Sequence, residues 1–335
     1  MKRKQGVERA LITGGAGFIG SHLAERLLED GYEVTIIDDL STGSMQNIEH
    51  LRVHHRFSFA IETILNLTVM DRLISECDIV FHFAAAVGVR LIVENPVGTI
   101  ETNVLGTEIV LKIANRYRKK VILPSTSEIY GKGNSIPFSE ESDRVLGSMT
   151  KSRWSYSSSK AVDEFLTLAY HSMYKLPVVI IRLFNTIGPR QTGSYGMVVP
   201  RFIKQALRGE PITVYADGKQ SRCFADVKDV VDAIVKLANC PEANGQIFNV
   251  GKDEEITIEN LARKIKHKIE SSSEICYISY EKAYVLGFED MRRRVPDLTK
   301  IRKFIDYKPQ ISLDQSLMDI IKDMRKNMAN GRDKK

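Results

Sequence analysis

The sequence has few cysteines and no long apolar run. Its four cysteines are scattered without a C-x-x-C pair, so we expect neither a disulfide framework nor a metal site; they are Cys77, Cys223, Cys240 and Cys276. No segment approaches the roughly eighteen consecutive apolar residues of a membrane span, and the first residues lack the apolar region of a signal peptide. Internal repeats and low-complexity tracts are also absent. These absences predict a soluble, cytoplasmic protein that does not bind a membrane.

The positive charge of the chain is modest and dispersed. The formal net charge is +6 and the pI is about 9.0. Lysines and arginines are spread along the chain, with some concentration at both ends, and they form no basic stripe with interleaved aromatic residues. A solvated surface is the usual meaning of this pattern. We therefore expect no nucleic-acid partner.

Apolar runs rich in β-branched residues alternate with helical patterns along the chain. The runs predict strands at 57–61, 79–83, 121–125, 178–184 and 247–250. Apolar residues recur at three- and four-residue spacing over 100–117 and 161–174, which predicts helices. Such alternation predicts an α/β fold with a Rossmann-type, doubly wound parallel sheet. With 335 residues and 43% hydrophobic content, the chain also has room for a smaller C-terminal lobe.

A glycine-rich turn follows the first apolar run and leads into a helical pattern. Its glycines, Gly14, Gly17 and Gly20, allow a sharp turn, a close approach of backbone N–H groups to a pyrophosphate, and close packing of helix on strand. A second strand at 33–38 ends in Asp38, where a carboxylate accepts hydrogen bonds from a ribose diol. Because its charge repels a 2′-phosphate, Asp38 favours NAD over NADP.

A second motif places a tyrosine and a lysine on one helix face. Tyr156 and Lys160 lie four residues apart at the start of an expected helix. A lysine ammonium beside a phenol stabilises the phenolate and lowers the tyrosine pKa, which makes Tyr156 a base near neutral pH. Ser127 and Thr126 lie at the end of a strand one crossover earlier, and this context makes the tyrosine and lysine pair a specific signal. Together with the glycine turn, these residues predict an enzyme.

With these motifs the chain resembles the extended short-chain dehydrogenase/reductases that remodel nucleotide sugars, the NAD-dependent epimerase/dehydratase family. The likeness runs over almost the full length, and its further parts are His82-Phe83-Ala84-Ala85, Asn103 with Gly106-Thr107, Arg182-Leu183-Phe184-Asn185, Gly188-Pro189-Arg190, Val214-Tyr215, Arg222, Asp226, Arg294 and Asp297. The resemblance implies that NAD is held by Gly14, Ala16, Gly17, Phe18, Ile19, Gly20, Asp38, Ala84, Ala85, Asn103, Ser125, Tyr156 and Lys160. It implies that a UDP-sugar is held by Arg90, Asn185, Val199, Tyr215, Arg222 and Arg294.

One stretch departs from the family pattern. The family commonly has an Asp near the adenine after the third strand, whereas this chain has Glu62-Thr63-Ile64 there. The adenine contact at this position is therefore not carried over by the resemblance. The nicotinamide half of the expected site is unaffected.

The resemblance also implies a reaction through a 4-keto sugar. Tyr156 would take the proton of the sugar 4-hydroxyl while C4 passes a hydride to NAD+. Glu128 and Arg153 resemble the pattern of UDP-glucuronate decarboxylases, in which a C5 carboxylate β to the new ketone leaves as CO2. An arginine would orient that carboxylate and a glutamic acid would protonate C5. Decarboxylation of a UDP-glucuronate-type sugar is therefore the first hypothesis, with the catalytic candidates Thr126, Ser127, Glu128, Arg153, Tyr156 and Lys160.

Several other hypotheses stay open. The segment 84–90 is more similar to 4-epimerases of UDP-hexoses or UDP-hexuronates, which lose no carbon. Dehydration is disfavoured because a 4,6-dehydratase of this family typically has Asp-Glu where this chain has Ser127-Glu128. Glu128 and Arg153 would alternatively form only a structural ion pair at the rim of the cleft. A non-catalytic NAD-binding module is the remaining hypothesis, and the intact Tyr156, Lys160 and Ser127 argue against it.

The motifs also predict how the chain is divided and assembled. We expect a Rossmann domain formed by residues 1–185 with 223–250 and a nucleotide-sugar-binding lobe formed by 186–222 with 251–325. Residues 326–335 are expected to be a frayed tail. The two helical stretches at 100–117 and 161–174 resemble those through which family members pair in a four-helix bundle. A homodimer is therefore expected.

Overall fold

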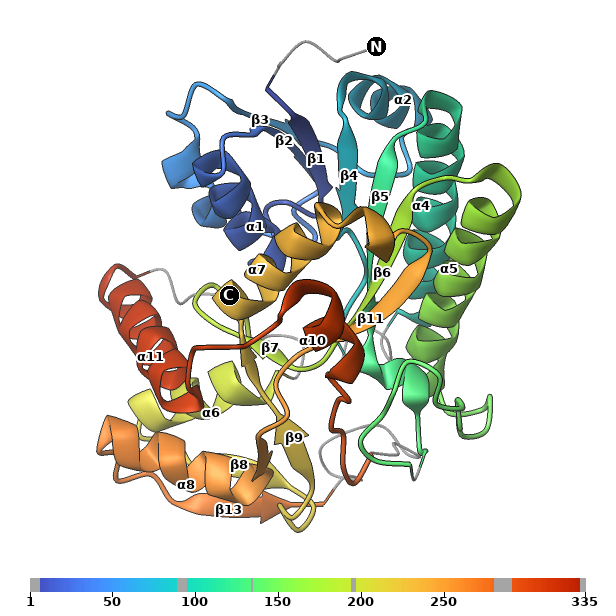
Figure 1. Ribbon diagram of the computed structural model, residues 1–335. Coiled ribbons are helices and arrows are strands. Elements are labelled where there is room, and N and C mark those ends of the chain that lie inside the picture. Colours follow the sequence, from blue (N-terminus) through green and yellow to red (C-terminus); the bar gives the residue numbers. More distant parts are fainter. Residues whose placement is uncertain (1–6, 89–94, 134, 194–196, 280–290, 332–335) are drawn as a thin grey trace.

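A seven-stranded parallel sheet forms the centre of the computed structural model, which describes residues 7–88, 95–133, 135–193, 197–279 and 291–331 (Figure 1). The strand order is β11-β6-β5-β4-β1-β2-β3. The strands are β1 (Arg9–Thr13), β2 (Glu33–Asp38), β3 (Phe57–Ile61), β4 (Ile79–His82), β5 (Lys120–Thr126), β6 (Val178–Leu183) and β11 (Gln246–Val250). The order reverses between β1 and β4, so the predicted doubly wound sheet is confirmed and its ligand crevice is expected at their carboxyl ends.

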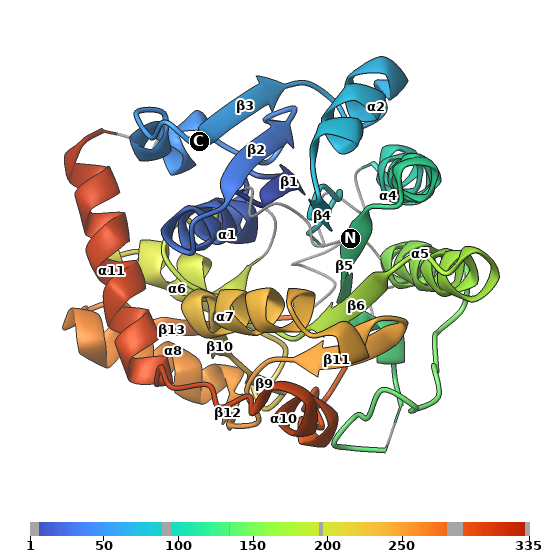
Figure 2. The ribbon, with the colours of Figure 1, turned by 45° about the horizontal axis from the view of Figure 1, so that its top comes forward.

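Helices cover both faces of the sheet (Figure 2). One face carries α2 (Leu67–Glu76), α4 (Pro96–Tyr117) and α5 (Arg153–Tyr174), and the other carries α1 (Phe18–Glu29) and α7 (Val227–Ala238). Successive strand residues point to opposite faces, so Ile12 and Ile36 join the core with α1 and α7 while Leu11 and Ile37 join the core with α2 and α4. Burial on both faces explains why the strands are continuous apolar runs.

The smaller lobe has a separate apolar core made by α6, α8, α11 and β8. These four elements are α6 (Val198–Leu207), β8 (Ile212–Tyr215), α8 (Ile258–Ile269) and α11 (Leu313–Ala329). The remaining elements of the chain are η1 (Met45–Asn47), η2 (Glu49–Leu51), η3 (Ser127–Tyr130), β7 (Thr186–Ile187), β9 (Ser221–Cys223), β10 (Ala225–Asp226), η4 (Pro241–Ala243), β12 (Glu255–Thr257), β13 (Ile275–Ile278) and α10 (Thr299–Ile305). Figure 1 shows α6, α8 and α11 grouped below the main sheet. None of the described helices is long and apolar enough to cross a membrane.

Some boundaries differ from those that periodicity predicts. Helix α4 begins at Pro96 rather than at residue 100, because the Asn95 side chain accepts from the Gly98 N–H and proline suits the first helical position. Helix α5 starts at Arg153, upstream of the periodic stretch 161–174. The frayed tail was expected over 326–335, but α11 continues to Ala329, so the expected start of the tail is too early.

The turn between β1 and α1 is held by very close backbone contacts. Gly14 has φ +70°, and a Cβ added there would lie 2.7 Å from the backbone nitrogen of Ala84, just after β4. A Cβ added at Gly20, in the first turn of α1, would overlap the carbonyl oxygen of Gly14. These contacts fix where α1 begins relative to the ends of β1 and β4.

We expect Gly20→Ala to lower the free energy of unfolding by about 1 to 3 kcal/mol, because the α1 and β1 backbones must separate to admit the methyl group. Urea denaturation measures this change. Gly193→Ala is the matched control, since its added Cβ would have its nearest contact at 3.4 Å, and a change within about 0.5 kcal/mol is expected. Equal losses in the two variants would contradict the steric explanation.

Candidate active site

A single cavity of about 670 Å3 collects most of the residues that the sequence motifs single out. It lies over the carboxyl ends of the central strands and reaches β8 and β9 of the smaller lobe. Its lining includes Gly14, Gly17, Phe18, Ile19, Gly20, Asp38, Ala84, Ala85, Ser125, Thr126, Ser127, Glu128, Arg153, Tyr156, Lys160, Asn185, Val199, Tyr215, Arg222 and Arg294. Ala16 and Asn103 lie behind this lining, and Arg90 lies outside the described residues. Within the described part of the chain, no three His, Cys, Asp or Glu residues are grouped to hold a metal ion.

Asp38 and the glycine turn form one end of the cavity. Asp38 is buried, and its two carboxylate oxygens accept the N–H groups of Ala16 at 2.9 Å and Leu40 at 2.8 Å. Burial raises the pKa of Asp38, and these two N–H groups oppose the rise. Gly17 caps α1 without a side-chain hydrogen bond, and the first turn of α1 holds no acid. The amide end of α1 therefore faces the cavity as an anion-binding surface.

Asn103 shapes the wall of the cavity from behind. It projects from α4, where its Oδ1 accepts the Ala86 N–H at 2.8 Å and its Nδ2 donates to the Ser159 hydroxyl of α5 at 3.3 Å. Thr13 makes a parallel contact at the end of β1, accepting the Ala84 N–H at 3.1 Å. The segment after β4 is thus held from two sides, which places Ala84 and Ala85 against the cavity.

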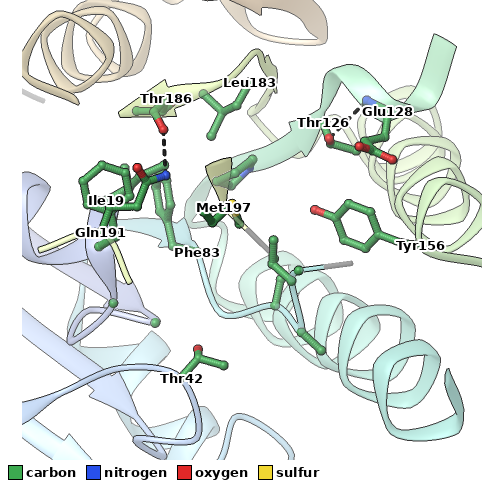
Figure 3. Close-up of a pocket in the computed structure, with 18 of the residues that line it drawn as sticks. Ile19, Thr42, Phe83, Thr126, Glu128, Tyr156, Leu183, Thr186, Gln191 and Met197 are labelled. Atoms are coloured by element: carbon green, nitrogen blue, oxygen red, sulfur yellow. Dashed lines mark hydrogen bonds between the residues drawn. The ribbon is translucent and has the colours of Figure 1, made fainter. Parts of the chain in front are cut away.

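Tyr156 points into the cavity from the first turns of α5. Figure 3 shows its hydroxyl directed toward the cavity, with Thr126 and Glu128 nearby. Thr126 caps η3 by accepting the Glu128 N–H at 3.1 Å, and the Ser157 hydroxyl donates to the Glu128 carbonyl at 2.9 Å. The first bond joins the end of β5 to η3, and the second joins η3 to α5. They fix the end of β5 relative to the predicted base.

The expectation that the pKa of Tyr156 is lowered is wrong for this structure. Burial raises the pKa of Tyr156 above its usual range, and the charges of Glu128 and Asp163 add to the rise. A hydrogen bond with Thr126 opposes it. The Lys160 ammonium is bound to a buried carboxylate, Asp163, at 2.8 Å. Because the charge of Lys160 is compensated inside the protein, its effect on the phenol is reduced.

Glu128 lies between two buried arginines. Its Oε1 accepts from Arg153 at 3.2 Å and from Arg294 at 2.9 Å. Arg294 also donates to Asn185 Oδ1 at 2.5 Å. Arg153 belongs to α5, whereas Arg294 comes from the segment after β13, so the cluster joins distant parts of the chain. The ion pair considered from the sequence does form, but inside the cavity rather than at an exposed rim.

The remaining predicted substrate residues lie toward the smaller lobe. Arg222 is buried on β9 and donates to the Ser221 carbonyl at 2.7 Å. Asn185 donates to the Cys223 carbonyl at 2.9 Å, which ties the end of β6 to that strand. Tyr215 ends β8, and the buried Val199 lies in α6. The structure therefore brings all the described substrate candidates into the lining of one cavity.

Three polar residues of the cavity were not predicted from the sequence. The Arg201 guanidinium lies 3.8 Å from the centre of the Tyr215 ring, and Gln220 donates to the Tyr215 carbonyl at 3.0 Å. Gln191 lines the cavity opposite Tyr156, where its amide donates to the Thr186 carbonyl (Figure 3). Arg201 carried no signal, because it lies off the helix face that Val199, Phe202 and Ile203 bury, where an arginine is ordinary. Nothing in the sequence marks the two glutamines.

The chain was compared with protein families, curated proteins and solved structures. Residues 11–320 match the family model described as GDP-mannose 4,6 dehydratase. Over 315 residues the chain is 44% identical to UDP-N-acetyl-alpha-D-glucosaminuronate decarboxylase of Bacillus cytotoxicus, covering 94% of this chain and 97% of the relative. It is 36% identical to UDP-glucuronic acid decarboxylase 1 of Xenopus tropicalis, covering 96% and 73%. UDP-glucuronic acid 4-epimerase from Bacillus cereus, solved in complex with UDP-glucuronic acid and NAD, superposes with a TM-score of 0.86 at 29% identity, covering 95% and 99%.

We expect Thr126→Ala to lower the free energy of unfolding by about 1 kcal/mol, because η3 loses its cap. The same change removes the hydrogen bond that holds down the pKa of Tyr156, so that pKa rises further. Urea denaturation checks the first effect. Thr126→Ser keeps the hydroxyl and is the control; if it loses as much stability as the alanine variant, the cap is not responsible.

Proposed function

Since the chain belongs to the family described as GDP-mannose 4,6 dehydratase, within the extended short-chain dehydrogenase/reductases, we propose that it is an NAD-dependent enzyme that decarboxylates a UDP-linked hexuronate through a 4-keto sugar. The observation that carries the proposal is the Glu128 carboxylate held between Arg153 and Arg294 in the cavity that Tyr156 enters. Both curated relatives reported above are named as decarboxylases of UDP-linked uronates.

The residues present fit a dinucleotide. The amide end of α1 at Gly17 suits a pyrophosphate, and the carboxylate of Asp38 at the end of β2 suits a ribose diol. The buried hydroxyl of Ser125 lines the same cavity and has no hydrogen-bond partner among the described residues, as expected of a group that serves a ligand. When bound, NAD supplies a hydride acceptor at C4 of the sugar and the hydride for a later reduction.

Tyr156 is the proposed base of the first step. As the phenolate, it takes the proton of the 4-hydroxyl while the C4–H bond breaks, which leaves a C4 ketone. Thr126 and Ser127, where β5 meets η3, hold that hydroxyl in line with Tyr156. Lys160, four residues further along α5, provides the cation on the same helix face.

The arginines and Glu128 are proposed to carry the second step. Guanidinium groups bind carboxylates through paired hydrogen bonds, so Arg153 and Arg294 suit the C5 carboxylate of the substrate. With a ketone at C4, the bond from C5 to that carboxylate breaks, CO2 leaves and the electron pair passes to the C4 oxygen. Glu128, which takes up a proton from solvent when the substrate carboxylate replaces it on the two arginines, then gives that proton to C5.

The smaller lobe is proposed to hold the UDP portion. Arg222 is a buried cation suited to the diphosphate, and Asn185, Val199 and Tyr215 complete this end of the cavity. A homodimer, a cytoplasmic location and the division into a cofactor-binding part (1–185 with 223–250) and a sugar-binding part (186–222 with 251–325) remain predictions of this proposal.

The second candidate is 4-epimerisation of a UDP-hexose or UDP-hexuronate. The solved epimerase reported above, which binds UDP-glucuronic acid and NAD, has nearly the same fold over almost the whole chain. In that reaction Glu128 and the two arginines would only bind the carboxylate and support the cavity. No C5 proton donor would be required.

We expect incubation of the protein and NAD+ with UDP-glucuronate or UDP-N-acetylglucosaminuronate to yield a product lighter by CO2. Mass spectrometry of the products measures this loss. UDP-glucose and UDP-N-acetylglucosamine are the matched substrates, because they lack the carboxylate and are expected to keep their masses. A uronate product of unchanged mass and altered chromatographic retention would replace decarboxylation by epimerisation.

We expect Glu128→Gln to keep or speed NADH formation in the first turnover, because loss of the Glu128 charge lowers the pKa of Tyr156. The same change is expected to lower kcat for the decarboxylated product by about 100-fold or more, because the amide cannot supply the C5 proton. Stopped-flow absorbance follows the first step and mass spectrometry the second. Glu255→Gln is the control, since it alters another Glu–Arg pair, with Arg293 at 2.9 Å, outside the cavity lining. Full kcat in the Glu128 variant would remove Glu128 from the mechanism.

A further inference from the structure

A buried acid next to the predicted lysine has no role in the steps above. Asp163 lies on α5 and is fully buried. Its Oδ2 accepts from the Lys160 ammonium at 2.8 Å, and the Lys160 side chain is itself only 4% exposed. A buried carboxylate is unfavourable unless it is paired and hydrogen-bonded, so this pair is a specific arrangement rather than a surface ion pair.

We propose that Asp163 is a positioning residue: it holds the Lys160 ammonium on the helix face that carries Tyr156 and places its own negative charge near that phenol. The inference rests on the proposed function, in which Tyr156 is the base. It adds a determinant that neither the glycine motif nor the tyrosine and lysine motif contains.

The helix geometry supports this assignment. Tyr156, Lys160 and Asp163 follow one another at spacings of four and three, which places them along one face of α5. The next residue, Glu164, serves a different cation, because it binds Arg182 of β6 at 2.8 Å. The two consecutive buried carboxylates therefore have separate partners. Of these partners, Lys160 lines the cavity and Arg182 does not.

The groups around Asp163 act on its pKa in opposite directions, and the net direction is a rise. Burial raises the pKa of Asp163, whereas the charge of Lys160 and its hydrogen bond lower it, and the Thr107 hydroxyl of α4 assists. Glu164 opposes ionisation, although its own charge is compensated by Arg182. His82, at the end of β4, is also near Lys160. Burial and that lysine lower the pKa of His82 to about 3, so it stays neutral above that pH.

The groups that face Tyr156 come from three places. Burial contributes most to its raised pKa, followed by the carboxylates of Glu128 on η3 and Asp163 on α5. Arg294, from the segment after β13, lowers it. Removing the charge of Asp163 while Glu128 and Arg294 remain therefore lowers the pKa of Tyr156. The phenolate then forms at lower pH.

The test is the pH dependence of NADH formation in a single turnover of the full-length protein with saturating NAD+ and UDP-glucuronate. Asp163→Asn keeps an acceptor for Lys160 but removes the charge, and we expect the acidic limb of the rate profile to move down by roughly one pH unit. Asp163→Glu restores the charge and is expected to return the limb toward its wild-type position. Asp232→Asn is the matched control, because it removes an aspartate that contacts Lys236 on α7 at the same 2.8 Å, outside the cavity lining.

An acidic limb that is unchanged in Asp163→Asn, or that moves to higher pH, overturns the inference and leaves the ion pair a structural one. Thermal melting identifies a variant that fails to fold; Asp163→Ser, which also removes the charge, then takes the place of the asparagine variant.

Failure of the proposed function is seen separately. Reduction of NAD+ without loss of CO2 rejects decarboxylation but leaves the pH test intact. If no UDP-sugar reduces NAD+, the effect of Asp163 on Tyr156 is tested instead by the ultraviolet absorbance of tyrosinate in the NAD+ complex. That absorbance is titrated as the difference between each protein and its Tyr156→Phe counterpart, and Asp163→Asn is expected to move the Tyr156 titration to lower pH.

Discussion

The close backbone contact between the β1–α1 turn and the end of β4 is the constraint on which the cavity depends. A side chain at Gly14 would meet the backbone at Ala84, and one at Gly20 would meet the carbonyl of Gly14. Because both contacts involve backbone, no rotamer change relieves them. They place the amide end of α1 beside the strand ends, and the hydrogen bonds from Thr13 and Asn103 hold the adjoining segment in position.

The opposite end of the cavity is organised by charge. Arg153, Arg222 and Arg294 are buried there, and Glu128 is the carboxylate that two of them share. These four side chains together carry excess positive charge. Such a cluster is more favourable with an anionic ligand, because buried cations lose hydration that opposite charge must replace. A UDP-linked uronate, with both a diphosphate and a carboxylate, meets that electrostatic requirement better than a neutral sugar does.

Elements with strong local signals could be predicted from the sequence, whereas the electrostatic details could not. The continuous apolar strands and the glycine turn follow from burial and sterics, so the parallel sheet was predictable. The start of α4 was displaced because capping by Asn95 outweighs periodicity. The pKa of Tyr156 was misjudged because spacing on a helix shows neither the burial of the phenol nor the approach of Glu128 from η3. Pairings over long sequence separations, such as that of Glu128 with Arg294, require the fold.

Glu128 and Tyr156 are coupled in a way that suits the proposed reaction. Ionised Glu128 raises the pKa of Tyr156, so protonated Glu128 favours the phenolate and ionised Glu128 favours the phenol. In the proposed sequence Tyr156 gains a proton from the 4-hydroxyl and Glu128 loses one to C5. The two residues therefore carry one negative charge between them before the first step and after the second. Between the two steps both residues are protonated, so through the second step Tyr156 and Glu128 are never ionised at the same time in this dry site. An epimerase protonates no carbon and has no use for this coupling. The coupling of Glu128 and Tyr156 therefore favours decarboxylation over epimerisation.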